Sequence, residues 1–385
     1  MAKYQKKIVI LCPKWIFCHF LWCFGDSINI IKRIFMCKTL HIFNPGHDLA
    51  LAADIDNFTP PHAARALRAS LDYLPALWAK DGDAVLVDDI AHARRAFTRV
   101  SQQVAKYRSW HEAEVEFVEE SDLLHISIDK IEPWGWDRSL VYSLRRRGVD
   151  DGLLPDAAEL CRVRDESHRR TAMQLLSRVG ISEAFECSSL NEIHNIIYKY
   201  NKVVAKAPWS SSGRGIRFLG DTPDEHTTGW LRNTLAQQGS VMVEPLYNKV
   251  LDFGMEFCRH HDGTVDYLGL SLFQTVNGAY TGNILATEVV KREILSHYFS
   301  LDTLDAFSSA ACAYLGNRLT YAGPFGIDMM ALEGGRLALA EINLRRTMGH
   351  VALAISPLDD DIRRVMHIQA GNICRLSIHT PQRLQ

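Results

Sequence analysis

From residue 40 onward, short apolar runs alternate with longer segments whose apolar residues recur every three or four positions. Short runs of Val, Leu, Ile and Phe predict buried strands, and the longer periodic segments predict helices. In the first third of the chain the predicted strands are 40–43, 84–87 and 115–118, and the predicted helices are 62–78 and 134–146. A strand that leads into a turn and a helix opens many doubly wound units, so this part is predicted to be an α/β domain.

The middle of the chain continues the alternation. One helix is predicted over 165–179, because Leu175, Leu176 and Val179 form an apolar stripe and Gly180 is suited to end a helix. The remaining predicted elements are a helix at 190–200, a strand at 203–206, a run of strands over 250–284 with a turn at 262–263, and a helix at 301–315. No sequence repeat or low-complexity tract interrupts this order.

Two apolar runs near the C-terminus flank a Glu-Gly-Gly-Arg turn at 333–336, and this arrangement predicts a β-hairpin. Asp328 lies in the first run. Glu341 and Asn343 lie two apart in the second, so on a strand they share one face with Arg345. Two carboxylates and an amide oxygen suit Mg²⁺, and an arginine beside them suits a phosphate or a carboxylate. The plainer alternatives are that Asp328 caps a turn and that Glu341 forms an ion pair with Arg345.

A second polar segment follows the predicted strand at 203–206, which ends in Lys206. It is a serine- and glycine-rich loop that contains Ser210, Ser211, Ser212, Gly213, Arg214 and Gly215. The backbone N–H groups and hydroxyls of such a loop can face phosphate oxygens. It is not a Walker A loop, because no Gly-Lys-Ser/Thr follows. Taken alone, Lys206 also fits a solvent-exposed strand end, and the loop also fits a plain connection.

Together these segments resemble the ATP-grasp superfamily, which combines a strand lysine, a flexible Ser/Gly loop and a distant Asp…Glu-x-Asn hairpin. Residues 240–246 are similar to the linker strand of that superfamily, and residues 252–257 are similar to the strand that follows it. The resemblance extends over residues 161–355, about half of the chain. It implies an α/β fold, with an ATP-grasp unit of two α+β lobes preceded by a small Rossmann-like domain.

The resemblance also implies residue roles. Lys206 would hold the α- and β-phosphates of ATP and Arg345 would meet the transferred phosphate, which makes these two the implied catalytic residues. Mg²⁺ or Mn²⁺ would be bound by Asp328, Glu341 and Asn343. The implied nucleotide-binding residues are Lys206, Ser210, Ser211, Ser212, Gly213, Arg214, Gly215, Glu244, Leu246 and Asp252. Proline at position 245 departs from the pattern because it lacks a backbone donor, which leaves the adenine contact at that point open.

The activity that the resemblance implies is that of a ligase that forms C–N bonds. ATP would convert a carboxylate into an acyl-phosphate, and an amine would then attack it, giving ADP and phosphate. The expected partners are a small-molecule carboxylate and an amine, for example an amino acid or a peptide, and a homodimer is one assembly that fits. The alternatives are an ATP-grasp phosphotransferase (kinase) and a catalytically inactive nucleotide-binding protein, since one fold can host several activities.

Composition narrows the classes of partner. The chain has 385 residues, of which 47% are hydrophobic and 23% charged, as in a globular protein with more than one domain. A net charge of −2 gives no electrostatic case for binding nucleic acid or an anionic membrane. The nine cysteines are scattered and include no Cys-x-x-Cys pair, which favours free thiols in a reducing cytoplasm.

Four regions are expected along the chain. Residues 36–155 would form the Rossmann-like domain, 156–240 the first ATP-grasp lobe, and 241–385 the second lobe with the metal site. Residues 1–35 differ from the rest because their apolar, aromatic run is short and interrupted by polar residues. Three interpretations of this segment stay open: translation that begins at Met36, a membrane anchor or signal peptide, and a genuine N-terminal extension.

Some polar residues have no role in the resemblance. Asn44, His47 and Asp48 follow the first predicted strand, where they either form and cap a turn or contact the acceptor substrate. The basic clusters 145–147 and 168–170 are predicted to be solvated helix faces, with a local anion site as the alternative. Further predicted substrate contacts are Arg346, Thr347 and His350, next to Gly349.

Overall fold

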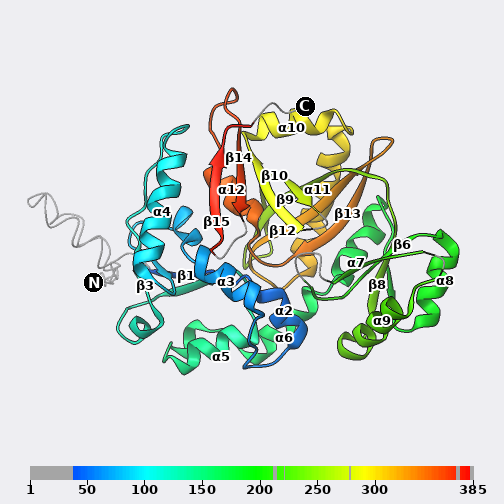
Figure 1. Ribbon diagram of the computed structural model, residues 1–385, viewed down its shortest axis with the longest axis horizontal. Helices are drawn as coiled ribbons and strands as arrows, with labels where there is room; N and C mark the ends of the chain where they lie inside the picture. Colours follow the sequence, from blue (N-terminus) through cyan, green and yellow to red (C-terminus); the bar gives the residue numbers. More distant parts are fainter. Residues whose placement is uncertain (1–37, 211–214, 221, 277–278, 370–372, 382–385) are drawn as a thin grey trace, which may run out of the picture.

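The structure is a computed structural model that describes residues 38–381 except 211–214, 221, 277–278 and 370–372. The interpretations of residues 1–35 concern a segment outside these residues, as do four residues of the predicted phosphate loop, Ser211, Ser212, Gly213 and Arg214. Within the described part, no helix is long and apolar enough to cross a membrane. The strands form three sheets, and Figure 1 shows the first at the left, the third in the centre and the second at the right.

The first sheet is parallel and has the strand order β3-β2-β1-β4. Its strands are β1 (Thr39–Ile42), β2 (Ala84–Leu86), β3 (Glu116–Val118) and β4 (Lys130–Pro133). The helices of this region are α2 (His47–Ala53), α3 (His62–Leu71), η1 (Leu74–Leu77), α4 (Ile90–Val104), η2 (Glu120–Leu124), α5 (Arg138–Arg146) and η3 (Asp151–Leu153). The three predicted strands are confirmed. The apolar pattern does not predict β4, because the sequence Lys-Ile-Glu-Pro contains no apolar run.

The second sheet is antiparallel and has the order β5-β8-β6-β7. Its strands are β5 (Phe185–Cys187), β6 (Val203–Lys206), β7 (Ile216–Leu219) and β8 (Val241–Pro245). The helices are α6 (Ala157–Glu166), α7 (Arg170–Val179), α8 (Leu190–Tyr200) and α9 (Glu225–Gln238). The predicted helix at 190–200 and the strand at 203–206 are confirmed. Gly180 ends α7 in the left-handed conformation, with φ at 68°, as its position predicts.

The single helix predicted over 165–179 is wrong. Two helices, α6 and α7, occupy this stretch, and the residues between them are not helical. Glu166, the last residue of α6, is buried, and its carboxylate accepts hydrogen bonds from the backbone N–H groups of Thr320 and Tyr321 at 2.8 and 2.9 Å. Tertiary contacts of this kind outweigh helical periodicity, and they hold the end of α6 against the segment that precedes β12.

The third sheet is antiparallel and has seven strands in the order β13-β12-β9-β10-β11-β14-β15. They are β9 (Lys249–Arg259), β10 (Val265–Val276), β11 (Ala279–Leu285), β12 (Gly323–Leu332), β13 (Arg336–Asn343), β14 (Arg364–Gln369) and β15 (Arg375–His379). The helices are α10 (Glu288–Ser296), α11 (Leu301–Arg318) and α12 (Met348–Ile355). The predicted run of strands, the helix at 301–315 and the C-terminal hairpin are confirmed.

Two hydrophobic cores cover the two faces of the third sheet. On one face, Phe253, Phe257 and Ile327 pack with residues of α7, α10 and α11. On the other face, Val351 of α12 belongs to a core that also contains Met366 of β14 and apolar residues of α4. The C-terminal strands therefore share a core with the first sheet and its helices, while the expected domain boundaries stay predictions.

Candidate active site

The β12–β13 hairpin brings the three predicted metal ligands together. Asp328 is paired with Glu341 across the hairpin, and Gly326 is paired with Asn343. The side-chain amide Nδ2 of Asn343 donates a hydrogen bond to Asp328 Oδ2 at 3.0 Å. Two carboxylates and an amide therefore meet at one place, while their binding of a metal stays a prediction.

These side chains lie on the face of the sheet that points away from the α10–α11 core. Ile327 and Met329 flank Asp328 in β12 and belong to that core, so alternation along the strand directs Asp328 to the opposite face. The pairing of β12 with β13 shifts after Asp328, and Ala340 is the extra residue of the resulting bulge. The bulge lets β13 keep its apolar residues on the core side while Glu341 faces the same way as Asp328.

Negative charge is concentrated at this point. Burial raises the pKa of Asp328 to about 8, and the charges of Glu341 and Glu256 act in the same direction, while Arg345 opposes them. Either a retained proton or a cation would relieve this repulsion. Among the residues that the structure describes, no group of three or more His, Cys, Asp and Glu side chains could hold a metal ion. The ligand set that the hairpin offers is thus two carboxylates and one amide.

Lys206 connects the second sheet to the hairpin. It is the last residue of β6, and its Nζ donates hydrogen bonds to Glu244 Oε2 at 2.7 Å and to the Ala340 carbonyl at 2.9 Å. The bulge described above presents this carbonyl to the lysine. Lys206 and Glu244 are 6% and 7% exposed, and burial raises the pKa of Glu244 although Lys206 acts in the opposite direction. Lys206 is therefore a buried cation at the site and not a solvent-exposed strand end.

Arg169 is a second buried cation at the site, and the apolar pattern of the sequence does not predict it. Its guanidinium donates to Ser210 Oγ at 2.9 Å, to the Ala207 carbonyl, and to Glu341 Oε1 at 2.7 Å. The side chain thereby joins the start of the Ser/Gly loop to the hairpin. Only the break between α6 and α7 gives Arg169 this position, and an uninterrupted helix would not.

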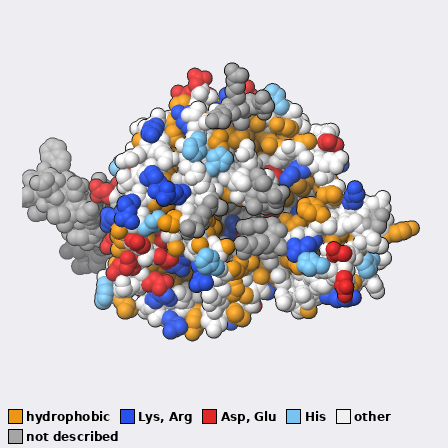
Figure 2. All heavy atoms as spheres, in the orientation of Figure 1, with side chains coloured by type: hydrophobic (Ala, Val, Ile, Leu, Met, Phe, Trp, Pro, Cys, Tyr) orange, Lys and Arg blue, Asp and Glu red, His pale blue; other side chains and the backbone are white. Residues whose placement is uncertain are grey.

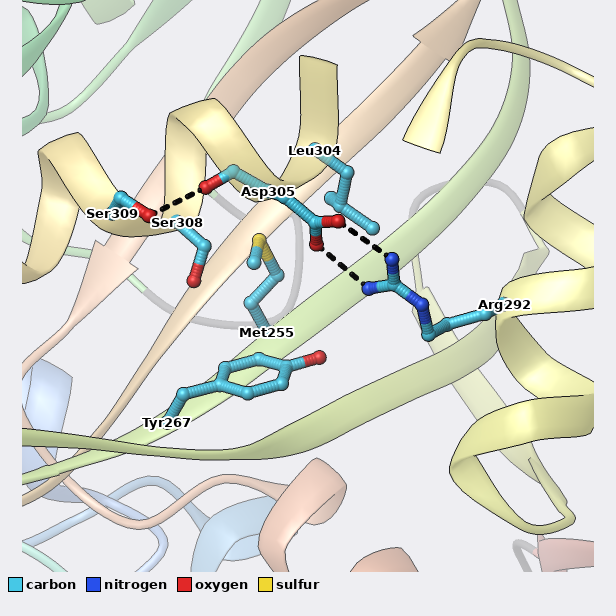
Figure 3. A pocket seen from close by; sticks show the side chains of 7 residues that line it. All are labelled: Met255, Tyr267, Arg292, Leu304, Asp305, Ser308 and Ser309. Carbon is cyan, nitrogen blue, oxygen red and sulfur yellow. Dashed lines mark hydrogen bonds and ion pairs between the residues drawn. The ribbon is translucent and has the colours of Figure 1, made fainter. Parts of the chain in front are cut away.

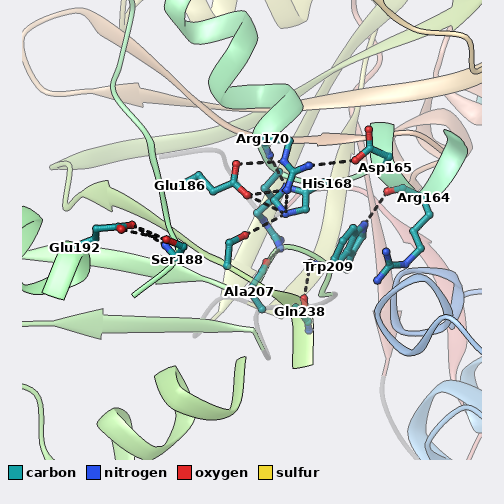
Figure 4. Close-up of polar contacts among 12 residues, drawn as sticks. Arg164, Asp165, His168, Arg170, Glu186, Ser188, Glu192, Ala207, Trp209 and Gln238 are labelled. Atoms are coloured by element: carbon teal, nitrogen blue, oxygen red, sulfur yellow. Dashed lines mark hydrogen bonds and ion pairs between the residues drawn. The ribbon is translucent and has the colours of Figure 1, made fainter. Parts of the chain in front are cut away.

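Trp209, at the start of the Ser/Gly loop, is held by contacts on several sides (Figure 4). The Trp209 indole Nε1 donates to the Arg164 carbonyl at 2.9 Å, and the Arg164 guanidinium lies over the indole ring at 3.9 Å. The His168 ring meets the indole edge-on at 4.7 Å. On the other side of the loop, Gly215 accepts a hydrogen bond from the backbone of Ala207 at 2.8 Å. Before the loop, Trp209 is therefore held by α6 and the α6–α7 connection, and after it Gly215 is held to the residue that follows β6.

The prediction that residues 168–170 form a solvated helix face is wrong. His168 and Arg169 are 1% and 6% exposed. Burial lowers the pKa of His168 to about 4, and the neighbouring charge of Arg170 acts in the same direction, so this imidazole is neutral near pH 7. The cluster at 145–147 differs, since Arg145 is exposed and pairs with a surface carboxylate. Basic and acidic side chains are interspersed over the first domain on the face seen in Figure 2.

Three of the predicted nucleotide-binding residues lie in or next to the strands around the site. Glu244 in β8 already has Lys206 as a partner. The carboxylate of Asp252 in β9 accepts from Lys249 Nζ at 2.5 Å and from Thr275 Oγ1 at 3.0 Å. Leu246 follows β8. Its side chain is exposed, and its backbone N–H donates to the Lys202 carbonyl at 3.0 Å. Their contact with a nucleotide stays a prediction.

Arg345 lies just beyond β13 and reaches across to α2, the helix that follows the first strand. Its Nε and Nη2 donate to the two carboxylate oxygens of Asp48 at 2.9 and 2.8 Å. Nη2 also donates to Asn343 Oδ1 at 3.1 Å. Burial opposes ionisation of Asp48, but the adjacent Arg345 outweighs it and lowers the pKa of Asp48. The guanidinium therefore sits at the carboxylate cluster with an ionised partner.

Glu256 in β9 is a further buried acid, outside the set of predicted site residues. It is 1% exposed, accepts from Thr347 Oγ1 at 2.7 Å, and lies 3.0 Å from His350 Nδ1. A Cβ atom on Gly349 would lie only 1.8 Å from Glu256 Oε1, so the glycine allows a side chain, and not a ligand, to approach the backbone. Thr347 and His350 thus contact this acid, and an acid within an apolar strand is the signal that would have revealed it.

A separate cavity of about 290 Å³ lies on the other face of the third sheet (Figure 3). Met255 of β9 lines it together with Tyr267 and residues of α10 and α11. Arg292 and Asp305 form a two-pronged ion pair at its edge, with N–O distances of 2.8 and 2.7 Å. None of the predicted site residues lines this cavity. The candidate active site is therefore the polar face formed by β12, β13 and the end of β6.

Solved structures share this architecture, whereas no family model and no curated protein matches the sequence. The biotin carboxylase domain of Hydrogenobacter thermophilus 2-oxoglutarate carboxylase, crystallised as a dimer with MgADP, ADP and bicarbonate, matches with a TM-score of 0.52 at 14% identity. The match covers 86% of this chain and 74% of that domain.

Two further structures match with lower TM-scores. N5-carboxyaminoimidazole synthetase from Staphylococcus aureus, complexed with ADP, has a TM-score of 0.49 at 11% identity and covers 86% of this chain and 82% of its own. Biotin carboxylase from Campylobacter jejuni has a TM-score of 0.49 at 13% identity, with 86% and 75% covered. Identities this low establish the fold and not the reaction. The chain has the ATP-grasp fold.

Proposed function

We propose that the chain is an ATP- and Mg²⁺-dependent ligase, which activates a carboxylate as an acyl-phosphate for attack by an amine and forms a C–N bond. The observation that carries the proposal is the contact of Lys206 with the Ala340 carbonyl. It brings a buried cation from the second sheet to the carboxylates of the third sheet. The domain from Hydrogenobacter thermophilus, which has the same fold and was crystallised with MgADP and bicarbonate, supports a nucleotide and magnesium as ligands.

The side chains present fit a magnesium–nucleotide complex. The crowded carboxylates Asp328 and Glu341 would gain a counter-charge, and Asn343 would add an amide oxygen, which together form a hard-oxygen set. When bound, Mg²⁺ would supply positive charge to the transferred phosphate. Lys206 and Arg169 are buried cations within reach of the same place, and they would offset the charge of the remaining phosphates.

The reaction requires positioning and exclusion of water more than it requires a nucleophilic side chain. Arg345, held by Asp48 and Asn343, would orient the acyl-phosphate with a planar set of donors. The buried surroundings of Lys206 and Glu244 keep water away, which protects an intermediate that hydrolyses readily. The amine and the carboxylate are proposed to be small molecules.

Thermal unfolding with and without Mg-ATP tests the nucleotide site. Ligand at about 100 times its dissociation constant adds roughly 2.7 kcal/mol to the free energy of unfolding, which is several degrees for a chain of this size. The matched variant is Glu341→Gln, which keeps an acceptor for Arg169 and removes one charged metal ligand. We expect the variant to lose the Mg²⁺-dependent shift. A shift of equal size in Glu341→Gln would place the metal elsewhere.

Product analysis tests the class of reaction. The protein is incubated with Mg-ATP and pools of carboxylates and amines, and ADP, free phosphate and phosphorylated acceptors are measured. A ligase releases phosphate in step with ADP only when a carboxylate and an amine are both present. Phosphate that stays on the acceptor would identify a phosphotransferase. Nucleotide binding without turnover in any pool would identify an inactive nucleotide-binding protein.

A further inference from the structure

The segment that follows β1 contributes an acid to the active site. Asp48 lies in the first turn of α2, in the first domain, and forms a two-pronged ion pair with Arg345. The two residues are 297 positions apart in the chain. Their side chains are 16% and 17% exposed, so most of the pair is shielded from solvent. The proposed chemistry of the hairpin does not by itself explain why the first domain supplies this carboxylate.

The surroundings of Asp48 hold it rigidly. The Asn44 amide donates to the Gly135 carbonyl at 2.8 Å and to Asp137 at 3.1 Å. The His47 ring packs so closely on Gly135 that a Cβ atom on residue 135 would lie 2.6 Å from the ring carbon Cδ2. Asp137 also caps α5, since its side chain accepts from a backbone N–H of that helix. The start of α2 is therefore fixed to the segment between β4 and α5, and a short side chain such as aspartate leaves its carboxylate close to that fixed backbone.

The hydrogen bonds of Arg345 leave its guanidinium little freedom. Nε and Nη2 bind Asp48, Nη2 also binds Asn343 Oδ1, and Nη1 donates to the Arg346 carbonyl at 3.0 Å. These bonds use four of its roughly five N–H donors. Of the three partners only Asp48 is charged. Asp48 is thus the charged hydrogen-bond partner that holds the plane of the guanidinium and offsets part of its charge.

We propose that Asp48 is a positioning residue, which fixes the orientation of Arg345 and offsets part of its charge during phosphoryl transfer. The proposal rests on the proposed function, in which Arg345 contacts the transferred phosphate. The negative charge of Asp48 has two separable consequences. Removing this charge should let Arg345 bind a phosphate more tightly, because a competing anion is gone. The same change should slow the reaction, because the guanidinium is no longer held in one plane.

The first experiment measures binding without turnover. Inorganic phosphate is titrated into the protein saturated with Mg-ADP, and the dissociation constant is obtained by calorimetry. We expect Asp48→Asn to bind phosphate about 10-fold more tightly and Arg345→Gln to bind it about 10-fold more weakly than the wild type. Weaker phosphate binding by Asp48→Asn would overturn the proposal, because loss of structure weakens binding.

The second experiment measures turnover with a general acyl-phosphate. Mg-ADP and acetyl phosphate are supplied; the phosphoryl group moves to ADP, the acyl P–O bond breaks, and ATP and acetate are formed. We expect Asp48→Asn to lower the rate about 10-fold in the wild type and by less than about 2-fold in Arg345→Gln, because Asp48 acts through Arg345. Equal losses in the two backgrounds would overturn the proposal.

Two further variants separate positioning from stability. Asp48→Glu keeps the charge but displaces it, so it should leave phosphate affinity near the wild-type value and still slow turnover. Asp305→Asn removes an acid from the comparable ion pair with Arg292 on the other face of the sheet, and it should change neither measurement.

The two proposals can fail independently. A wild type that forms no ATP from acetyl phosphate would count against the proposed function. The phosphate titration, which can be repeated without nucleotide, would still decide the role of Asp48. Unchanged phosphate affinity in Asp48→Asn would then overturn this second proposal.

Discussion

Around β9, β12 and β13, the two faces of the third sheet differ in kind although the same strands form both. In β9, Phe253, Met255 and Phe257 face α10 and α11 and are at most 1% exposed. The residues between them include Gly254 and Glu256, which lie beside the carboxylates of the hairpin. One face is filled by aromatic and aliphatic side chains, while the other combines acids, an amide and closely approaching glycines.

The difference separates two sources of free energy. On the apolar face, large side chains are buried away from water, and this burial stabilises the fold by roughly 25 cal/mol per Å² of apolar surface. The polar face gains less, because buried acids lose their hydration and repel each other, as the raised pKa of Asp328 indicates. The stability of one face allows the other to keep a reactive, unfavourable arrangement. Truncating a side chain of the apolar face should therefore lower stability, whereas removing the charge of a buried acid from the polar face should raise stability and weaken ligand binding.

The largest effect on stability is expected at Phe257. It is fully buried, and its ring stacks on Phe325 at 5.1 Å between centroids. Phe257→Ala should lower the free energy of unfolding by about 4 kcal/mol, because it removes buried area and leaves a cavity. Urea denaturation gives the value directly. Tyr198→Ala, at a side chain that is 91% exposed, is the control and should change it by less than about 0.5 kcal/mol.

If Phe257→Ala lowered the unfolding free energy no more than the control Tyr198→Ala, the apolar face would be loosely packed. The comparison between the faces would then lose its basis. Nucleotide binding measured well below the unfolding temperature should be unaffected by Phe257→Ala, since the ring points away from the site.

The next largest effect is expected on the polar side, at Lys206. Lys206→Met leaves the carboxylate of Glu244 buried without its partner, which should cost about 3 kcal/mol of unfolding free energy. Adding Glu244→Gln to this variant removes the unpaired charge and should restore most of the loss. Denaturation of the two single variants and the double variant checks this. An unchanged loss in the double variant would show that the lysine stabilises through its contact with Ala340 instead.

Much of this site could be predicted because its residues follow local rules. The hairpin has a glycine turn and period-two alternation, so the shared face of Glu341 and Asn343 follows from the sequence. Lys206 ends a short apolar run that contains two valines, which favours a strand. The bulge at Ala340 could not be predicted, since nothing in Leu-Ala-Leu-Ala marks which residue is extra.

The contributions of distant segments could not be predicted either. Arg169 depends on a helix break that tertiary contacts impose at Glu166, against the local periodicity. Asp48 reaches Arg345 only because the first sheet and its helices share a core with the C-terminal strands. Both depend on contacts between residues more than a hundred positions apart, and one sequence without comparison contains no record of such pairing.

A smaller, pH-dependent effect is expected at Asp328 in protein free of metal and nucleotide. Its pKa rises from 3.8 to about 8 on folding, so the native state holds a proton that the unfolded chain has lost. Stability should therefore fall as the pH rises from about 4 to about 8, and remain lower above that. Asp328→Asn removes this loss. The variant should match the wild type near pH 4 and exceed it by roughly 2 kcal/mol near pH 8.5.

Thermal unfolding across the pH range, in the presence of a chelator, checks this prediction. Parallel curves for the two proteins would contradict it, since they would mean that the pKa of Asp328 is the same in the native and unfolded states. With Mg-ATP added, the order should reverse near neutral pH, because the wild type gains binding energy that Asp328→Asn lacks.

The smallest effect is expected where an ion pair lies at the surface of the apolar side. Arg292 and Asp305 have the same two-pronged geometry as Arg345 and Asp48, but the side chain of Asp305 is 56% exposed. Water screens such a pair, so Asp305→Asn should change the unfolding free energy by less than about 1 kcal/mol, and less still in high salt. Denaturation at low and high ionic strength measures it. A loss of unfolding free energy as large as that of Lys206→Met would show that geometry, and not burial, sets the strength of ion pairs in this protein. The difference between the two sides of the sheet would then not extend to their ion pairs.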